Sequence, residues 1–448
     1  MSSYLSHTKE EQQAMLKAMG IASINELFAD IPKQVRLNRE LLLPPALSEM
    51  ELTSYMQKLS QQNANLDAYS CFLGAGAYDH FIPSVVGNLT ARQEFYTAYT
   101  TYQPEISQGT LQAIFEFQSM ICELTGMDIA NASMYDGATA LAEAVAMACS
   151  HTRRNEMLIA STVHPESREV IKTYARYKGI EVKEIDYDNG SIDFGCLEAA
   201  LSDQTAAVIV QNPNFFGIIE DLGQAAELAH HHKALLIASV DPISLAILKS
   251  PGELAADIVV GDGQCLGNPI SFGGPGLGFM ATSKALMRKL PGRVVGQTTD
   301  LDGKRAFVLT LQTREQHIRR DKATSNICSN QALNALAATI YMTVLGKEGL
   351  KEVANLCFNK AHYLYDQLIQ SGKFTPVFSA PFFKEFAIIS SCETKALNTA
   401  LLLDQIIGGY ELEKSYPQLK NGWLLAVTEK RTRTEIDSLV EKAVNYCD

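Results

Sequence analysis

Residues 262–269, DGQCLGNP, follow a run of apolar residues and precede a glycine-rich segment, SFGGPGLG, at residues 271–278. The apolar run, AADIVV at residues 255–260, predicts a buried strand of a parallel sheet. In open α/β sheets, binding residues lie beyond the carboxyl ends of the strands. We therefore expect the octet at the functional edge of the sheet.

Short apolar runs recur along the middle of the chain and alternate with helical patterns. Besides the run already quoted, they lie at residues 157–160, 207–210, 234–238 and 277–280. Strands that are apolar on both faces and separated by helices are typical of a mostly parallel sheet covered on both sides. The pattern therefore predicts a large α/β domain over residues 66–330.

The two ends of the chain have different patterns. Residues 1–65 are polar and helical in periodicity, and they predict a helical N-terminal arm. Residues 331–448 combine helical patterns with two apolar runs, and they predict a smaller C-terminal α+β domain. Its helices are expected at residues 332–365 and 434–446, and its strands at residues 386–389 and 423–427.

The composition excludes several classes of partner. The chain has 448 residues and a formal net charge of −12, so we expect no nucleic-acid partner and no contact with anionic membrane. The N-terminal stretch lacks the apolar core of a signal sequence, and no stretch is long and apolar enough to cross a bilayer. Nine cysteines without a CxxC pair predict reduced thiols, and no metal site is expected. These features predict a cytoplasmic protein.

Two short segments next to the predicted strands carry candidate binding residues. Gly137 and Thr139 begin a helical run, where free backbone N–H groups and a threonine hydroxyl can seat an anion. The alternative is an ordinary capped helix start. His164 follows the strand at residues 157–160 and can stack on a planar ring. The alternative for His164 is a loop histidine that is hydrogen-bonded to a neighbour.

Two further segments follow the next strands of the predicted sheet. Residues 211–217, QNPNFFG, offer amides that can bond a ring substituent, although Asn-Pro and Gly also make turns. Asp241 follows the strand at residues 234–238. A carboxylate in a dry crevice requires a cationic partner, such as a protonated pyridine nitrogen. The alternative for Asp241 is a cap of the following helix.

In their order, these parts resemble fold-type I pyridoxal-phosphate enzymes, which have a phosphate seat, a stacking residue, an amide, a pyridine-binding aspartate and a lysine at a strand end. Three longer motifs resemble the glycine cleavage P-protein family. They are FLGAGAYDH at residues 72–80, YTAYTTYQPEISQGTLQ at residues 96–112 and RRDKATSNIC at residues 319–328. The resemblance covers nearly the whole chain. The chain is similar in length to subunit 1, the N-terminal-half type, of the two-subunit form of this family.

The resemblance also implies where the cofactor is held. Subunit 2 of that family has a His-Lys pair at the strand end, and aligning the two halves puts Gln264 at the lysine position. A glutamine amide is not nucleophilic and forms no Schiff base. We therefore expect no Schiff-base lysine in this chain and pyridoxal 5'-phosphate held covalently by the partner. Gly137, Thr139, His164 and Asp241 would then line a degenerate cofactor crevice.

The activity that the resemblance implies is glycine decarboxylation through pyridoxal phosphate, which stabilises the resulting carbanion as an electron sink. The aminomethyl group then passes to the lipoyl arm of the H-protein. The implied partners are P-protein subunit 2, the lipoylated H-protein and the small substrate glycine. A heterotetramer of the α2β2 kind fits the family.

Two segments are candidates for a contribution in trans, since dimeric fold-type I enzymes place the site at the subunit interface. The first is the loop at residues 99–109, and the second is the basic stretch at residues 319–326, whose guanidinium groups can hold a phosphate or the glycine carboxylate. The alternative is that both segments only pack or form ion pairs at the interface. The residues expected to contribute are Tyr102, Gln103, Glu105, Ser107, Arg319, Lys322, Thr324, Ser325 and Asn326.

Two rival hypotheses stay open. The chain can be a non-catalytic scaffold that stabilises its partner and docks the H-protein. It can also be a self-contained pyridoxal enzyme with a noncovalent cofactor and a base such as His164. Activity of isolated subunit 2 would favour the first, and an absorbance band of bound cofactor in the isolated chain would favour the second.

Overall fold

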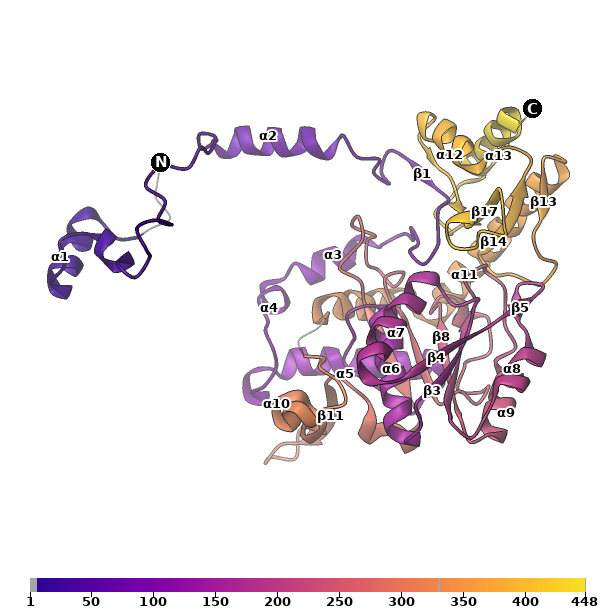
Figure 1. Ribbon diagram of the computed structural model, residues 1–448, viewed down its shortest axis with the longest axis horizontal. Helices are drawn as coiled ribbons and strands as arrows, with labels where there is room; N and C mark the ends of the chain where they lie inside the picture. Colours follow the sequence, from indigo (N-terminus) through magenta and orange to yellow (C-terminus); the bar gives the residue numbers. More distant parts are fainter. Residues whose placement is uncertain (1–5, 329–330, 448) are drawn as a thin grey trace. The chain divides into compact units, whose positions relative to one another are not determined.

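The computed structural model describes residues 6–328 and 331–447 (Figure 1). Contacts divide the chain into two compact units, one ending at Asn63 and the other beginning at Ala64. The bounds of the three expected domains, at residues 65 and 330, stay a prediction. No helix of the described residues is long and apolar enough to span a membrane.

The first unit is built from three short helices. They are α1 (Lys9–Met19), η1 (Ile24–Phe28) and α2 (Glu49–Ser60). Thr8 and Ser48 begin the two α-helices with capping boxes, in which a hydroxyl and a glutamate satisfy backbone N–H groups that have no partner inside the helix. None of the described residues in these helices is buried.

A seven-stranded sheet is the centre of the second unit. Its order is β2 (Ile129–Ala130), β10 (Gly278–Thr282), β9 (Ile258–Asp262), β8 (Leu235–Val240), β7 (Thr205–Asn212), β3 (Glu156–Ala160) and β4 (Glu181–Ile185). Strands β9, β8, β7, β3 and β4 run parallel, whereas β10 pairs antiparallel with both of its neighbours. The prediction of a mostly parallel sheet is therefore confirmed, including every strand that the apolar runs indicated.

Helices cover both faces of this sheet, as Figure 1 shows for α6 and α7 on one side and α8 and α9 on the other. The helices are α5 (Gln108–Thr125), α6 (Gly137–Thr152), α7 (Pro165–Lys178), α8 (Phe194–Ala200) and α9 (Leu222–His231). All five residues of β3 are buried, and apolar residues of β7, β8 and β9 pack beside them in one large core. Burial on both faces explains why these strands are uninterrupted apolar runs.

The C-terminal part is an antiparallel sheet with helices. Its strands are β13 (Phe374–Pro376), β14 (Glu385–Ser390), β17 (Gly422–Ala426) and β16 (Tyr410–Glu411), and its helices are α11 (Ala332–Gln370), α12 (Thr394–Leu403) and α13 (Arg433–Cys447). These elements confirm the predicted helices and strands. Trp423 and Phe386 lie in a second core between this sheet and its helices. Gly346 interrupts α11 with non-helical angles of φ 60° and ψ −175°.

One expectation about cysteines is wrong. Cys392 and Cys447 form a disulfide, although all nine thiols were predicted to be reduced. Cys392 follows β14 and Cys447 ends α13, and folding brings their Cα atoms to 5.3 Å. A separation of 55 residues without a motif gives no sequence signal for this pair, because only the packing of α13 makes the two side chains neighbours.

Short elements connect the parts described above. They are β1 (Ser70–Cys71), α3 (Ser84–Thr90), α4 (Gln93–Tyr96), η2 (Pro104–Ile106), β5 (Tyr187–Asp188), β6 (Ser191–Ile192), η3 (Ser244–Ala246), η4 (Lys284–Lys289), β11 (Val294–Thr299), β12 (Arg305–Thr310), η5 (Gln312–Arg314), α10 (Gln316–Arg319), η6 (Arg320–Lys322), β15 (Ile406–Ile407) and η7 (Leu412–Lys414). Strand β1 pairs in parallel with β15 in a separate two-stranded sheet, and residues 72–80 follow β1.

Candidate functional site

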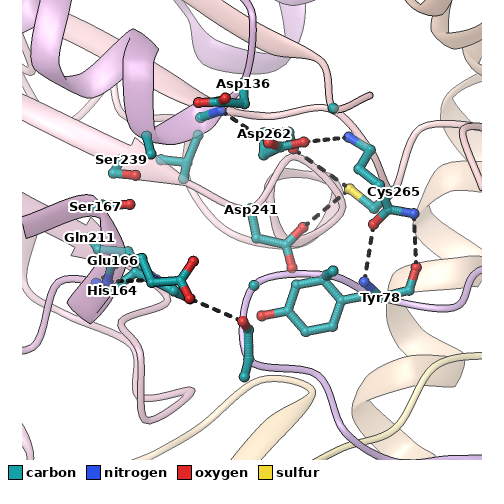
Figure 2. A pocket seen from close by; sticks show the side chains of 18 of the residues that line it. Tyr78, Asp136, His164, Glu166, Ser167, Gln211, Ser239, Asp241, Asp262 and Cys265 are labelled. Carbon is teal, nitrogen blue, oxygen red and sulfur yellow. Dashed lines mark hydrogen bonds between the residues drawn. The ribbon is translucent and has the colours of Figure 1, made fainter. Parts of the chain in front are cut away.

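A cavity of about 490 Å³ lies at the carboxyl ends of β3, β7, β8 and β9. Figure 2 shows Asp241, Asp262 and Tyr78 around it. The four residues expected to line a crevice, Gly137, Thr139, His164 and Asp241, all border this cavity. Gln264 borders it too, together with Lys384 and Glu385 at the start of β14, which the sequence analysis missed.

Side chains of this chain fill the expected anion seat at the start of α6. Asp262 Oδ2 accepts a hydrogen bond of 3.0 Å from the N–H of Gly137, and Asp136 Oδ1 accepts one of 2.7 Å from the N–H of Thr139. The hydroxyl of Thr139 also bonds Asp136. Burial raises the pKa of Asp262 above its ordinary value. The helix start that would bind an anion is thus occupied by carboxyl groups from the same chain.

Asp241 forms a buried ion pair with Lys384. Asp241 Oδ2 lies 2.6 Å from Lys384 Nζ, and only 2% of the lysine side chain is exposed. Burial is the largest single influence and lowers the pKa of Lys384, but the charge and hydrogen bond of Asp241, together with nearby Cys265 and Cys357, leave the pKa above its ordinary value. The ammonium also lies 3.7 Å from the centroid of the Tyr78 ring. The cationic partner expected for Asp241 is therefore present, and it is a lysine of this chain.

A chain of polar contacts continues from Lys384 into the interior. Lys384 Nζ lies 3.2 Å from His80 Nε2, and His80 Nδ1 lies 2.6 Å from Glu429 Oε2. Burial alone raises the pKa of Glu429, but hydrogen bonds from His80 and from the backbone N–H of Phe81 help to lower it to about 2. Cys357 Sγ is the third potential metal ligand in this cluster. Because these atoms bond one another and a lysine ammonium lies beside His80, the cluster is explained without an ion.

Gln264 stabilises the loop that enters the cavity. Its amide oxygen accepts a bond of 3.0 Å from the N–H of Tyr78, and its amide nitrogen donates to the carbonyls of Tyr78 and Asn268 at 3.2 and 2.7 Å. A lysine ammonium donates but does not accept, so it cannot make the bond to the Tyr78 N–H. At the position where the resemblance implies a reactive amine, this chain has a structural amide.

His164 is fixed by its neighbours. Its Nε2 atom lies 3.0 Å from the carbonyl oxygen of Ala75, and its Nδ1 atom accepts from the N–H of Glu166 at the start of α7. The loop passes so close that a Cβ on Gly76, whose φ is 99°, would lie 2.9 Å from His164 Nε2. This approach explains the glycine in the FLGAGAYDH motif. The histidine ring contacts Phe215 edge-to-face.

Glu385 is a buried carboxylic acid of the cavity with a raised pKa. Its two carboxyl oxygens accept bonds from the N–H of Ala75 at 2.6 Å and from the hydroxyl of Tyr78 at 2.8 Å. Burial is the main cause that raises its pKa from 4.5 to about 7. A group whose pKa is raised on folding holds its proton more tightly in the native state.

We expect the free energy of unfolding to fall as pH rises from about 4.5 to 7, because the unfolded glutamate ionises there and the folded one does not. The Glu385→Gln variant should lose this pH dependence. Between pH 5 and pH 8, its free energy of unfolding should therefore rise by up to about 3 kcal/mol relative to that of the native chain. Urea unfolding of the purified chain at both pH values measures it. The exposed Glu413→Gln variant is the control, and equal slopes for Glu385→Gln and the native chain would contradict the assignment.

The two segments expected to act in trans approach each other at Tyr102 and α10. Tyr102 contacts His317 of α10 edge-to-face at 6.5 Å, and Gln108 bonds the Phe307 backbone in β12. Most of the expected residues are exposed. Those exposed are Tyr102, Gln103, Glu105, Arg319, Lys322, Thr324 and Asn326, whereas Ser107 and Ser325 are half-buried.

Within these segments, backbone contacts fix several of the expected residues. Arg319 Nε donates to the carbonyl of Thr313 at 3.2 Å, and Lys178 of α7 donates to the carbonyl of Thr324. The hydroxyl of Ser325 accepts from a backbone N–H two residues later. The hydroxyl of Tyr102 accepts from Arg293 at 3.1 Å. Arg293 was not predicted, since no motif marks it.

The missed residues differ in what the sequence offers. Lys384 and Glu385 interrupt the apolar segment PFFKEFAIIS, and adjacent charges inside a buried strand are a signal that a functional or structural pair is present. Asp262 belongs to the quoted octet, but its role depends on the distance to α6. Arg293 has no such signal, because its burial follows from the packing of β11 against α5.

Comparison with known proteins gives a consistent result. The family model described as glycine cleavage system P-protein matches residues 2–443. A probable glycine dehydrogenase (decarboxylating) subunit 1 from Carboxydothermus hydrogenoformans is 56% identical over 438 residues, which is 98% of each chain. The protein of the same description from Anoxybacillus flavithermus is 55% identical over 443 residues, or 99% of each chain.

Solved structures agree with this result. A crystal structure of glycine decarboxylase (P-protein) of the glycine cleavage system, in inhibitor-bound form, matches with a TM-score of 0.91 and 44% identity over 99% of this chain and 100% of that chain. A sphingosine-1-phosphate lyase from Burkholderia pseudomallei, with 13% identity over 93% of this chain and 94% of that chain and a TM-score of 0.68, has the same fold as this chain. The family match spans nearly the whole chain, so this chain belongs to the glycine cleavage system P-protein family.

Proposed function

We propose that this chain is one subunit of a two-subunit glycine dehydrogenase (aminomethyl-transferring, decarboxylating), active only with its partner, subunit 2. The relatives named subunit 1 support the activity and the existence of a partner. The observation that carries the division of labour is the buried pair of Lys384 and Asp241. Lys384 pairs with the carboxylate of Asp241, which a pyridinium nitrogen would otherwise need as its own partner.

Pyridoxal phosphate does not fit the cavity of this chain. Its phosphate would compete with Asp262 and Asp136 for the start of α6, its ring nitrogen would compete with Lys384, and Gln264 offers no nucleophilic amine. We infer that subunit 2 holds the cofactor covalently. The crevice bordered by Gly137, Thr139, His164 and Asp241 is then a degenerate one, closed by polar contacts within the chain.

The proposed reaction takes up glycine, releases carbon dioxide and transfers the aminomethyl group to the lipoyl arm of the H-protein. This chain contributes to the partner's site in trans. The residues proposed for this are Tyr102, Gln103, Glu105, Ser107, Arg319, Lys322, Thr324, Ser325 and Asn326. Their support is the exposure of all of them except Ser107 and Ser325, which are half-buried, and the contact of Tyr102 in the first segment with His317, close before the second. Exposed Tyr96 precedes the first segment, and exposed Tyr99 and Ile106 lie within it; these apolar surfaces suit a protein interface.

The proposed setting is a cytoplasmic α2β2 heterotetramer. The net charge of −12 supports small-molecule and protein partners over nucleic acid or an anionic membrane. The large exposed aromatic residues Tyr96 and Tyr99, at 69% and 81%, support a contact between subunits because they gain most from burial.

We expect Tyr102→Ala, Glu105→Ala and Thr324→Ala, tested one at a time in the reconstituted pair, to lower kcat/KM for glycine decarboxylation. A loss of about 10- to 100-fold for Tyr102→Ala corresponds to one lost polar contact at the reacting site. Tyr177→Ala, which removes an exposed tyrosine from α7, is the matched control. Release of labelled carbon dioxide from glycine measures the rates.

Native rates for all three variants would show that these residues contribute nothing to the partner's site. The scaffold hypothesis predicts that outcome, and it also predicts measurable glycine–bicarbonate exchange by subunit 2 alone. The proposed function requires that isolated subunit 2 lacks this exchange and regains it when the chain is added.

A further inference from the structure

Arg293 is a buried cation without a carboxylate partner among the described residues. It is 9% exposed, and its Nη2 atom donates to the hydroxyl of Tyr102 at 3.1 Å. Its guanidinium lies over the Tyr102 ring, 5.4 Å from the centroid. No acceptor in the described chain lies within hydrogen-bond distance of its Nε atom. Burying a charge without an opposite charge is costly, so this arrangement indicates that an anion arrives from outside.

A second cavity of about 180 Å³ lies directly beside this guanidinium. It is enclosed by α4, the loop that leads to Tyr102, α5 and the start of α11. Arg293 provides a charge to its wall, and Thr101 and Thr110 are among the other lining residues. Tyr96 and Tyr99 line it as well, and both belong to the exposed aromatic face proposed as the subunit interface. The cavity is therefore small, largely apolar and cationic at one point.

The other basic residues of this face differ from Arg293 in burial. Arg319 and Lys322 are exposed, so water already solvates their charges. Arg293 is nine-tenths buried and has a free donor, so it gains far more from an anion. Among these three cations, Arg293 is thus the one that is built to recognise a negatively charged group.

We propose that Arg293 binds the carboxylate of glycine in the site that this chain forms with its partner, with Tyr102 held in place by the same guanidinium. This inference rests on the proposed function. The carboxylate is the only anionic group of glycine, and a guanidinium offers it planar, paired donors. No other charged group of the substrate remains for this chain to bind, since the amino group reacts at the partner's cofactor.

The chemistry of decarboxylation gives the proposal a distinctive kinetic signature. The negative charge leaves the carboxylate as the carbon–carbon bond breaks, so a guanidinium on that carboxylate stabilises the bound substrate more than the transition state. Removing such an interaction raises KM and leaves kcat unchanged or higher. A residue that only supports the fold of the loop would lower kcat as well.

The test uses the reconstituted holoenzyme with Arg293→Gln and Arg293→Lys, and the exposed Arg288→Gln in η4 as the control. Binding of glycine and of methylamine, which has the amino group but no carboxylate, is measured from the change in cofactor absorbance. We expect the Kd and KM for glycine to rise about 10- to 100-fold in Arg293→Gln, and less in Arg293→Lys. The Kd for methylamine should stay within about twofold.

Three outcomes would overturn the inference. Equal weakening of glycine and methylamine would mean that Arg293 only positions Tyr102. Unchanged glycine binding in both variants would mean that glycine is not the anion. Failure of the variant chain to assemble with subunit 2, judged by size-exclusion chromatography, would mean that a carboxylate of the partner occupies the cavity. If Arg293→Gln does not fold, the test rests on Arg293→Lys, which keeps the charge. This variant must then bind glycine more weakly while its Kd for methylamine stays unchanged.

The Tyr102→Ala variant separates this inference from the proposed function. If Tyr102→Ala is impaired while Arg293→Gln binds glycine normally, only the role of Arg293 is wrong. If both variants decarboxylate at the native rate and the chain is dispensable for subunit 2, the contribution in trans fails and the role of Arg293 fails with it.

Discussion

Replacing Lys384 with methionine is expected to lower the free energy of unfolding by about 3–5 kcal/mol, because it leaves the carboxylate of Asp241 buried without its cation. Only 2% of the lysine side chain and 13% of the aspartate side chain are exposed, so water cannot replace the lost partner. Methionine has a similar length, which limits the cavity that the change creates. Urea unfolding of the purified chain at neutral pH measures the loss.

The double variant Lys384→Met/Asp241→Asn is the decisive control. It removes both charges, so it should recover most of the stability that Lys384→Met loses. Lys304→Met removes one partner of an exposed ion pair, with side chains 76% and 75% exposed, and should change stability by less than about 1 kcal/mol. A loss below about 1 kcal/mol for Lys384→Met would show that the pair is not the buried bond described above.

The second large effect concerns activity. The purified chain, supplied with glycine and pyridoxal phosphate, is expected to release carbon dioxide no faster than the free cofactor, whereas the reconstituted pair turns over steadily. Borohydride reduction of the pair followed by peptide mapping should place the pyridoxyl group on a lysine of subunit 2. A pyridoxyl-lysine in this chain, or steady carbon dioxide release from it alone, would end the proposed division of labour.

The variant Gln264→Lys makes this prediction sharper. It restores an amine at the strand end, but Lys384 still pairs with Asp241 and Asp262 still occupies the start of α6. We therefore expect borohydride to trap no cofactor on it. Stoichiometric trapping on Gln264→Lys would mean that the missing amine is the only defect and that the rest of the crevice is open.

The motif FLGAGAYDH illustrates how far sequence reasoning goes. Its resemblance to a family is visible in the letters, but the need for Gly76 is not. The reason is the approach of this loop to His164, with a φ of 99° and no room for a side chain. The loop also receives Gln264 and Glu385 as hydrogen-bond partners. These contacts join segments that are far apart in the chain, and no periodicity encodes them.

The sequence by itself determined the alternation of buried strands and helices, the family, and the lack of an amine at Gln264, because apolar periodicity and long motifs are properties of neighbouring residues. Only the tertiary structure decided that Lys384 neutralises Asp241, that Asp262 occupies a helix start and that Arg293 lies buried with no carboxylate partner among the described residues. Each of these depends on which distant side chains share one small, poorly hydrated volume. There, the balance of charges sets the free energy, and the order of residues along the chain does not reveal that balance.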